Sequence, residues 1–122
     1  MKGEAVTTML EAKAERKACE SLTSVFDLLG KRWTALIVDL LLQGPARFSE
    51  LARAIPGVSN RVLAARLQEL IEAGLVDRIV DPGPPTTTTY SLTALGEHIG
   101  PALEELREWA AELTDAPCGR RG

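Results

Sequence analysis

The chain has few of the residues from which catalytic and metal sites are built. Among its 122 residues there is one histidine, His98, and there are two cysteines, Cys19 and Cys118, which lie far apart and form no C-x-x-C pair. A closed zinc site within one chain is therefore not expected, and neither is a disulfide framework. Because the sequence also has no nucleophile–base pair and no glycine-rich phosphate loop, we expect a protein that is not an enzyme and uses no cofactor or metal.

Long apolar runs are also missing. No stretch approaches the roughly 20 residues needed to cross a bilayer, and the first 20 residues are charged, unlike a secretory signal. We therefore expect a cytoplasmic protein without membrane contact. Hydrophobic residues make up 45% of the chain, enough for one small domain, and the high surface-to-volume ratio of such a domain favours a dimer.

Charge is distributed unevenly along the chain. The formal net charge is −3, but residues 31–80 contain seven basic and five acidic residues, whereas residues 81–122 contain three basic and seven acidic ones. A basic segment can form a positive face although the whole molecule is negative. The distribution is therefore compatible with a nucleic-acid partner for the middle of the chain.

The spacing of apolar residues predicts two helices before this middle part. The first begins at Ser21 and ends near Gly30. The second runs from Trp33 to Leu42, and because it is almost continuously apolar, we expect it to be the most buried helix. Pro45 prevents it from continuing.

A helix, a tight turn and a second helix follow. The short first helix covers residues 48–55, with Ser49 or a neighbouring residue as its cap, and Pro56-Gly57 forces the turn. The second helix begins after Ser59, a good N-cap, and ends at Gly74, where a left-handed residue is expected. Its leucines recur on one side and its arginines lie away from them, which is typical of a helix that enters a DNA major groove.

The rest of the chain predicts a hairpin and a last helix. Strands are expected at residues 75–80 and 86–92, joined by a proline- and glycine-rich tip, and a hairpin after a helix-turn-helix is the wing of a winged helix. Thr93 is expected to cap one helix that runs to about Leu113 and is kinked by Pro101.

Several ordered motifs carry a family resemblance. They are L-L-G-K-R-W-T (28–34), G-P-x-R-F-S-E-L (44–51), P-G-V-S (56–59), L-x-x-R-L-x-E-L-x-x-A-G-L-V (63–76) and Y-S-L-T-x-L-G (90–96). From about Cys19 to Trp109 the chain resembles the HxlR-type family of bacterial winged-helix regulators, which is related to the MarR-like group. The resemblance implies a DNA-binding transcription factor that forms homodimers through its first and last helices.

With this resemblance, the sequence predicts a mainly α-helical fold with a small β-hairpin. Residues 1–18 would form a flexible arm, residues 19–113 a winged helix-turn-helix domain with N- and C-terminal dimerisation helices, and residues 114–122 a flexible tail.

Two positions depart from the family pattern. The family commonly has a proline after the cysteine that precedes the first helix, whereas here Glu20 follows Cys19. The wing of the family often carries an arginine after its two prolines, whereas here Thr86 follows Pro84-Pro85. No basic residue occurs between Val80 and Leu92, so reading of a minor groove by this wing is not expected, although threonine hydroxyls can still contact phosphates.

DNA recognition needs donors that reach base edges and positive charge near phosphates. Asn60, Arg61 and Arg66 on the second helix are the candidates for base contacts, since arginine can bond O6 and N7 of guanine together. The N-terminus of the second helix can bind a phosphate through its free N–H groups, and the helix before it is expected to cross the DNA backbone and contact phosphates. The alternative is that these are solvated surface residues. The predicted DNA-contacting residues are Arg47, Ser49, Arg53, Ser59, Asn60, Arg61 and Arg66.

Two further groups allow alternative interpretations. Some family members sense oxidants or electrophiles through a cysteine before the first helix, so Cys19 is a possible redox sensor or an inert residue beside a dimer helix. Phe26, Trp33 and Trp109 either line an effector pocket or pack in the core and the dimer interface. His98 is expected to be solvated or packed.

The sequence is compatible with two functions from different classes. The first is a homodimeric transcriptional regulator that binds a pseudo-palindromic double-stranded DNA operator and acts as a repressor released by a small-molecule or thiol-reactive signal. The alternative is a winged-helix protein-interaction module without a DNA target. Salt dependence separates them, since binding through phosphates weakens as the salt concentration rises.

Overall fold

The fold is organised around α3 (Thr34–Leu41), the almost continuously apolar segment. In the computed structural model, which describes residues 16–115, Ile37, Val38 and Leu41 of this helix are buried, as the sequence predicts. They form one core with the buried leucines of α5 and the apolar residues at the base of the sheet. Most of the predicted arm (1–18), nearly all of the tail (114–122) and Cys118 lie outside the described residues.

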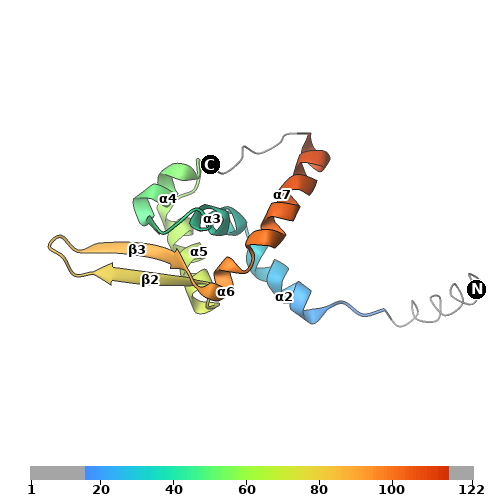
Figure 1. Ribbon diagram of the computed structural model, residues 1–122, viewed down its shortest axis with the longest axis horizontal. Helices are drawn as coiled ribbons and strands as arrows, with labels where there is room; N and C mark the ends of the chain where they lie inside the picture. The colour runs from blue at the N-terminus through green and yellow to red at the C-terminus, as the bar shows by residue number, and fades with distance from the viewer. Residues whose placement is uncertain (1–15, 116–122) are drawn as a thin grey trace, which may run out of the picture.

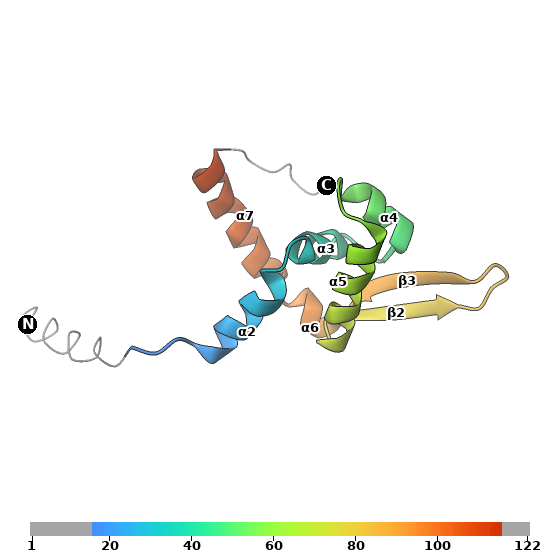
Figure 2. The same ribbon diagram turned by 180° about the vertical axis from the view of Figure 1, so that it is seen from behind.

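The predicted fold class is confirmed: the protein is mainly helical with a small antiparallel sheet (Figures 1 and 2). The elements in chain order are α2 (Glu20–Leu29), α3, β1 (Ala46–Arg47), α4 (Phe48–Ala54), α5 (Asn60–Glu72), β2 (Val76–Asp81), β3 (Thr87–Leu92), α6 (Ala94–Glu97) and α7 (Gly100–Thr114).

The sheet contains the predicted hairpin and one additional strand. β2 pairs with β3 in antiparallel register from Val76 opposite Leu92 to Asp81 opposite Thr87, and this hairpin is the wing. The two-residue strand β1 pairs with the other edge of β3, where Ala46 lies opposite Tyr90. β1 is not predicted from the sequence, because two residues are too few to show the alternation of a strand.

The helix-turn-helix forms as predicted. Gly57 in the turn has φ of 92°, a left-handed conformation that favours glycine. Ser59 caps α5, since its hydroxyl oxygen accepts a hydrogen bond from the Val62 N–H at 3.1 Å, and Gly74 follows the helix with φ of 81°. The cap of α4 is Arg47 rather than Ser49, and the Glu50 carboxylate accepts a hydrogen bond from the Arg47 N–H at 2.7 Å.

The prediction of one kinked last helix is wrong, because two helices occupy this part of the chain. Thr93 caps α6 as expected, but α6 ends at Glu97, and α7 begins at Gly100. Pro101 lies in the first turn of α7. Proline has no N–H to donate and clashes with the carbonyl four residues before it, so it ends the first helix and is tolerated only at the start of the next.

The helices α2 and α7 extend from the core at the end opposite the wing (Figures 1 and 2). Neither helix contains a buried residue. Both carry large exposed apolar side chains, among them Leu22 and Phe26 on α2 and Leu106, Trp109 and Leu113 on α7. Arg107 ties α7 to the core through an ion pair with Asp39 of α3.

Candidate nucleic-acid interface

The helix α5 presents two different faces. Leu63, Leu67 and Leu70 are buried against the core, which fixes the rotation of the helix about its axis. The side chains that point away from the core near its N-terminus are exposed, and they are Asn60, Arg61, Ala64 and Ala65. This face combines polar donors with small side chains, so a partner can approach the helix backbone closely.

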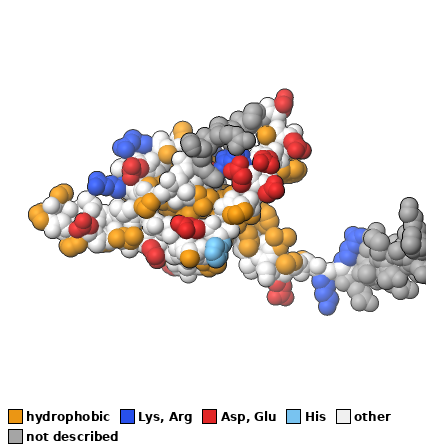
Figure 3. All heavy atoms as spheres, in the orientation of Figure 1, with side chains coloured by type: hydrophobic (Ala, Val, Ile, Leu, Met, Phe, Trp, Pro, Cys, Tyr) orange, Lys and Arg blue, Asp and Glu red, His pale blue; other side chains and the backbone are white. Residues whose placement is uncertain are grey.

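Cationic side chains accompany this face on the neighbouring elements. Arg47 at the start of α4 and Arg53 near its end are exposed, and so is Ser49 between them. Figure 3 shows Lys and Arg side chains near α4 and Asp and Glu side chains along α7. The acidic α7 lies apart from α4 and α5, so its carboxylates are not beside the exposed cations of α4.

Six of the seven predicted DNA-contacting residues are exposed on α4, on α5 or at their starts, but Arg66 differs. Its side chain is 22% exposed and its guanidinium is bound within the protein. Arg66 Nε donates to the backbone carbonyl of Arg32 at 3.3 Å, and Nη1 donates to both carboxylate oxygens of Glu69 at 3.2 and 3.1 Å. The side chain is thus directed to the loop between α2 and α3.

Glu69 is the centre of this polar group. Its carboxylate also accepts a hydrogen bond from Lys31 Nζ at 3.1 Å. The hydrogen bond from Lys31 lowers the pKa of Glu69, and the charge of Arg66 acts in the same direction, whereas partial burial opposes them. Glu69 is therefore held in its charged form between two cations. The i, i+3 spacing of Arg66 and Glu69 is the only local signal for this group, because Lys31 and Arg32 lie 38 and 34 residues away from their partners.

The other flank of α5 contacts the wing. Arg78 of β2 donates to Gln68 Oε1 at 3.1 Å, and its guanidinium lies 5.9 Å from the ring centroid of Tyr90, its partner across the strands. Arg78 is not among the residues predicted to contact DNA. It is exposed on β2 and adds a cation beside Gln68 on the exposed side of α5.

Cys19 lies at the N-terminus of α2. Its sulfur accepts a hydrogen bond from the Leu22 N–H at 3.3 Å, so the residue is the N-cap of the helix. The thiol is exposed and borders an open hollow that Phe26 also lines. Cys19 is therefore both a structural cap and accessible to reagents from the solvent.

The three candidate aromatic residues have different surroundings. Phe26 and Trp109 are 57% and 54% exposed, on α2 and α7 respectively. Trp33 is half-buried and packs against the core, with the Arg32 guanidinium 4.4 Å from its ring centroid.

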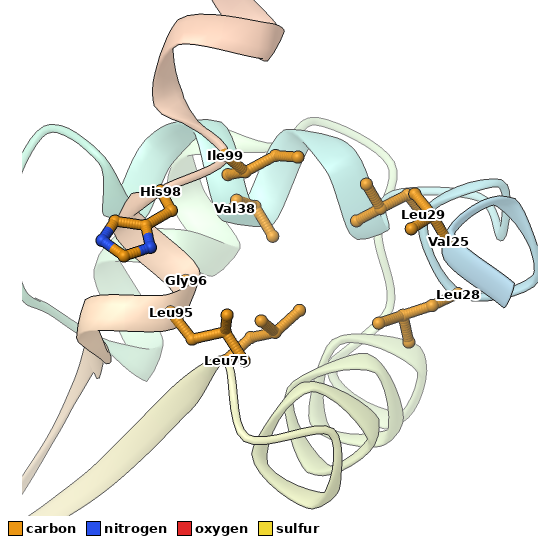
Figure 4. Close-up of a pocket in the computed structure, with 9 residues that line it drawn as sticks. All are labelled: Val25, Leu28, Leu29, Val38, Leu75, Leu95, Gly96, His98 and Ile99. Atoms are coloured by element: carbon orange, nitrogen blue, oxygen red, sulfur yellow. The ribbon is translucent and has the colours of Figure 1, made fainter. Parts of the chain in front are cut away.

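A separate apolar cavity of about 370 Å³ lies between α2, α3 and α6. Figure 4 shows Leu28 and Leu29 of α2 facing Leu75 and Leu95 across it. None of the three aromatic rings lines this cavity, whereas His98 does. The residues that line it are Val25, Leu28, Leu29, Val38, Leu75, Leu95, Gly96, His98 and Ile99.

The model of the HxlR-like helix-turn-helix family matches residues 28–117, which include every element from α3 to α7. The chain belongs to the HxlR-like helix-turn-helix family. The resemblance in the sequence motifs is thereby confirmed, and both helices of the helix-turn-helix, α4 and α5, lie within the matched residues.

Similar proteins support the same assignment. YvaP of Bacillus subtilis (strain 168), an uncharacterized HTH-type transcriptional regulator, is 45% identical to this HxlR-like chain over 101 residues, which are 83% of the chain and 94% of YvaP. The quinone-bound crystal structure of YodB from B. subtilis matches with a TM-score of 0.69 and 38% identity over 78% of the chain and 99% of YodB. The redox regulator HypR in its reduced form matches with a TM-score of 0.73 and 29% identity over 80% of the chain and 95% of HypR.

The HxlR-like chain is thus a member of a family of transcriptional regulators with winged helix-turn-helix domains, and these relatives are regulators rather than enzymes. Within residues 16–115, no group of three or more histidine, cysteine or acidic side chains is placed to hold a metal ion. Every helix in this part of the chain is too short or too polar to cross a membrane.

Proposed function

We propose that the protein is a homodimeric transcriptional repressor that inserts α5 into the DNA major groove of a pseudo-palindromic operator. The observation that carries the proposal is the exposed face of α5 with Asn60 and Arg61, next to the exposed cations of α4. In this proposal Asn60 and Arg61 contact base edges, Ser59 and the N-terminus of α5 bind a phosphate, and Arg47, Ser49 and Arg53 bind the backbone. Such a regulator acts in the cytoplasm, where bacterial DNA lies.

The helices α2 and α7 support the homodimer. Each has no buried residue, and each exposes large apolar side chains such as Phe26 and Trp109. Large apolar side chains that are exposed together on one part of a surface are typical of a protein–protein interface. In the dimer, residues 19–113 would be one winged helix-turn-helix domain with its dimerisation helices, flanked by the arm (1–18) and the tail (114–122).

The release signal acts at α2 in this proposal. Cys19 is an exposed thiol at the N-terminus of this helix, and modification of its sulfur would remove the hydrogen bond that caps it. The relatives support a thiol-reactive signal, because YodB has been observed with a bound quinone and HypR is a redox regulator. A small apolar effector could act instead through the cavity between α2, α3 and α6.

The experiment that tests the proposal is selection of the tightest duplex from a random-sequence DNA library on the purified protein, followed by binding titrations over a range of salt concentrations. A palindromic consensus and an affinity that falls steeply with salt are expected. Arg61→Ala should weaken binding and relax the base preference at one position of each half-site. Recovery of no consensus, with no salt-dependent binding, would favour the alternative of a protein-interaction module.

A further inference from the structure

Three consecutive residues between α2 and α3 contact the second helix of the helix-turn-helix and lie beside the turn that precedes it. We call these residues, Lys31 to Trp33, the 31–33 loop. Lys31 bonds to Glu69 of α5, and the Arg32 carbonyl accepts from Arg66. The edge of the Trp33 ring lies beside the turn, since a Cβ at Gly57 would be 3.7 Å from its Cη2 atom. The loop therefore touches α5 at its middle and the turn that leads into it.

The loop has a defined shape. Trp33 has φ of 80°, a left-handed conformation that a residue with a side chain rarely adopts. The Arg32 guanidinium lies over the Trp33 ring, and the Thr34 N–H donates to the Lys31 carbonyl at 3.2 Å. Because strain of this kind persists only when the surroundings determine it, the loop is a fixed connector rather than a flexible linker.

The polar groups of α5 that face the loop are already occupied. Arg66 and Glu69 lie one turn apart, the Glu69 carboxylate accepts hydrogen bonds from Arg66 and Lys31, and Arg66 Nε is bound to the Arg32 carbonyl. To reach a base, Arg66 would have to break all of these bonds and leave the charge of Glu69 with one partner fewer. Arg61, in contrast, is fully available on the exposed face.

We propose that the 31–33 loop is a brace between α2 and the recognition helix, and that Arg66 and Glu69 are positioning residues of this brace rather than DNA contacts. The inference rests on the proposed function, in which α5 reads DNA. It proposes for Arg66 a role other than the base contact predicted from the sequence. It also gives α2 a route to the DNA-binding surface, because the loop continues from the C-terminal end of α2 and a shift of that helix would move α5 through these contacts.

A pair of matched substitutions tests the brace, because the brace and simple charge repulsion predict changes of DNA affinity in opposite directions. Glu69→Gln and Glu72→Gln each remove one negative charge from α5, and only Glu69 bonds to the loop. If the two carboxylates only repel phosphates, both variants bind the selected duplex more tightly. The brace predicts that Glu69→Gln weakens binding by about fivefold or more, comparable to one mismatched base pair, while Glu72→Gln does not weaken it.

Substitutions of Arg66 test its role directly. A phosphate contact would be largely kept in Arg66→Lys and would lower the salt slope by about one unit in Arg66→Ala. A base contact would relax the preference at a single base pair. The brace predicts that both variants weaken binding with an unchanged salt slope and an unchanged consensus, because lysine cannot bond to the Arg32 carbonyl and Glu69 with the fork geometry of arginine.

A measurement without DNA separates the brace from the proposed function. In a Trp109→Phe background, Trp33 is the remaining tryptophan, and its fluorescence reports on the loop. The brace predicts that Glu69→Gln changes the emission or the acrylamide quenching of Trp33 and that Glu72→Gln does not. If the parent protein binds no duplex but this change is seen, the brace stands and the DNA-binding function fails.

The opposite pattern overturns the brace. It is overturned if the parent protein binds the duplex, Glu69→Gln binds as tightly as Glu72→Gln or more tightly, and Trp33 fluorescence is the same in both. It is also overturned if Arg66→Ala changes the consensus at one base pair. Circular dichroism and thermal unfolding of each variant confirm that the comparison is made between folded proteins.

Discussion

The guanidinium of Arg107 on α7 and the carboxylate of Asp39 on α3 form an ion pair that ties the last helix to the core. Both side chains are mostly shielded from solvent, and the hydrogen bond that Arg107 donates to the Asp39 carboxylate raises the pKa of Arg107. Because α7 has no fully buried residue, this pair acts together with the half-buried Leu103, which packs against the core, in setting the angle at which α7 leaves the domain. That angle determines where a second subunit could lie.

Replacement of this arginine should loosen α7. Arg107→Met keeps the aliphatic part of the side chain but leaves Asp39 without the guanidinium, so we expect the free energy of unfolding to fall by about 1–2 kcal/mol. Urea denaturation at neutral pH measures the change. A double variant that also carries Asp39→Asn should lose less than the sum of the two single losses, since the two residues share one interaction. Strictly additive losses would contradict the importance of this pair.

The stability of the domain should depend on pH through Glu69. Its pKa in the folded protein is lowered from the ordinary value of 4.5, so the charged form is bound more strongly in the folded than in the unfolded state. The stabilisation is complete above pH 4.5 and is lost as the pH falls through the lowered pKa. Glu69→Gln should therefore be less stable than the parent at neutral pH, and the difference should shrink below pH 4.5. Denaturation at several pH values measures this difference, and a gap that grows on acidification would contradict the assignment.

Charge placed on the apolar faces of α2 and α7 should prevent dimer formation. Phe26→Glu and Trp109→Glu alter side chains that are more than half exposed, so the fold of one subunit should survive. The dissociation constant of the dimer should rise about tenfold or more, because burial of one large apolar side chain contributes about 1.5–3 kcal/mol. Sedimentation velocity measures the association, with Glu108→Lys, an exposed position of α7 away from the apolar face, as the control. A dimer of unchanged strength in both variants would show that the interface lies elsewhere.

Replacement of Cys19 should separate its structural and chemical roles. In Cys19→Ser the hydroxyl can still accept the Leu22 N–H, and serine is a good N-cap, so stability should be kept or slightly raised. The thiol is lost, so the variant should stay bound to the selected duplex when a thiol-reactive quinone is added, whereas the parent protein dissociates. Cys118→Ser is the matched control and should respond like the parent. Equal responses of the parent and Cys19→Ser would exclude Cys19 as the sensor.

The parts of the fold that could be predicted from sequence are those with local signals. Ser59 and Gly74 delimit α5 because capping depends on residues within one turn of the helix end. The buried leucines of α5 follow from helical spacing for the same reason. The winged hairpin could be predicted because its turn residues and its threonines lie next to each other in the chain.

The features that differ from the sequence-based predictions depend mainly on contacts between residues that are far apart in the chain. β1 exists only through its pairing with Tyr90, which is remote in sequence, and the position of Arg66 depends on a carbonyl 34 residues away. A helical projection shows which side of α5 holds Arg66, but it does not show that a loop covers that side. The division of the last helix is different, because Pro101 was a visible local signal and the error was to expect a kink where the proline ends one helix and starts another.

The central claim is that α5 lies in the major groove, and methylation protection of guanine N7 on the selected duplex tests it most directly, because N7 is exposed only in that groove. The account predicts two protected patches about one helical turn apart, with protection of one guanine in each patch lost in Arg61→Ala. A complex in which every guanine N7 reacts as in free DNA, or in which Arg61→Ala leaves the protection unchanged, would contradict it.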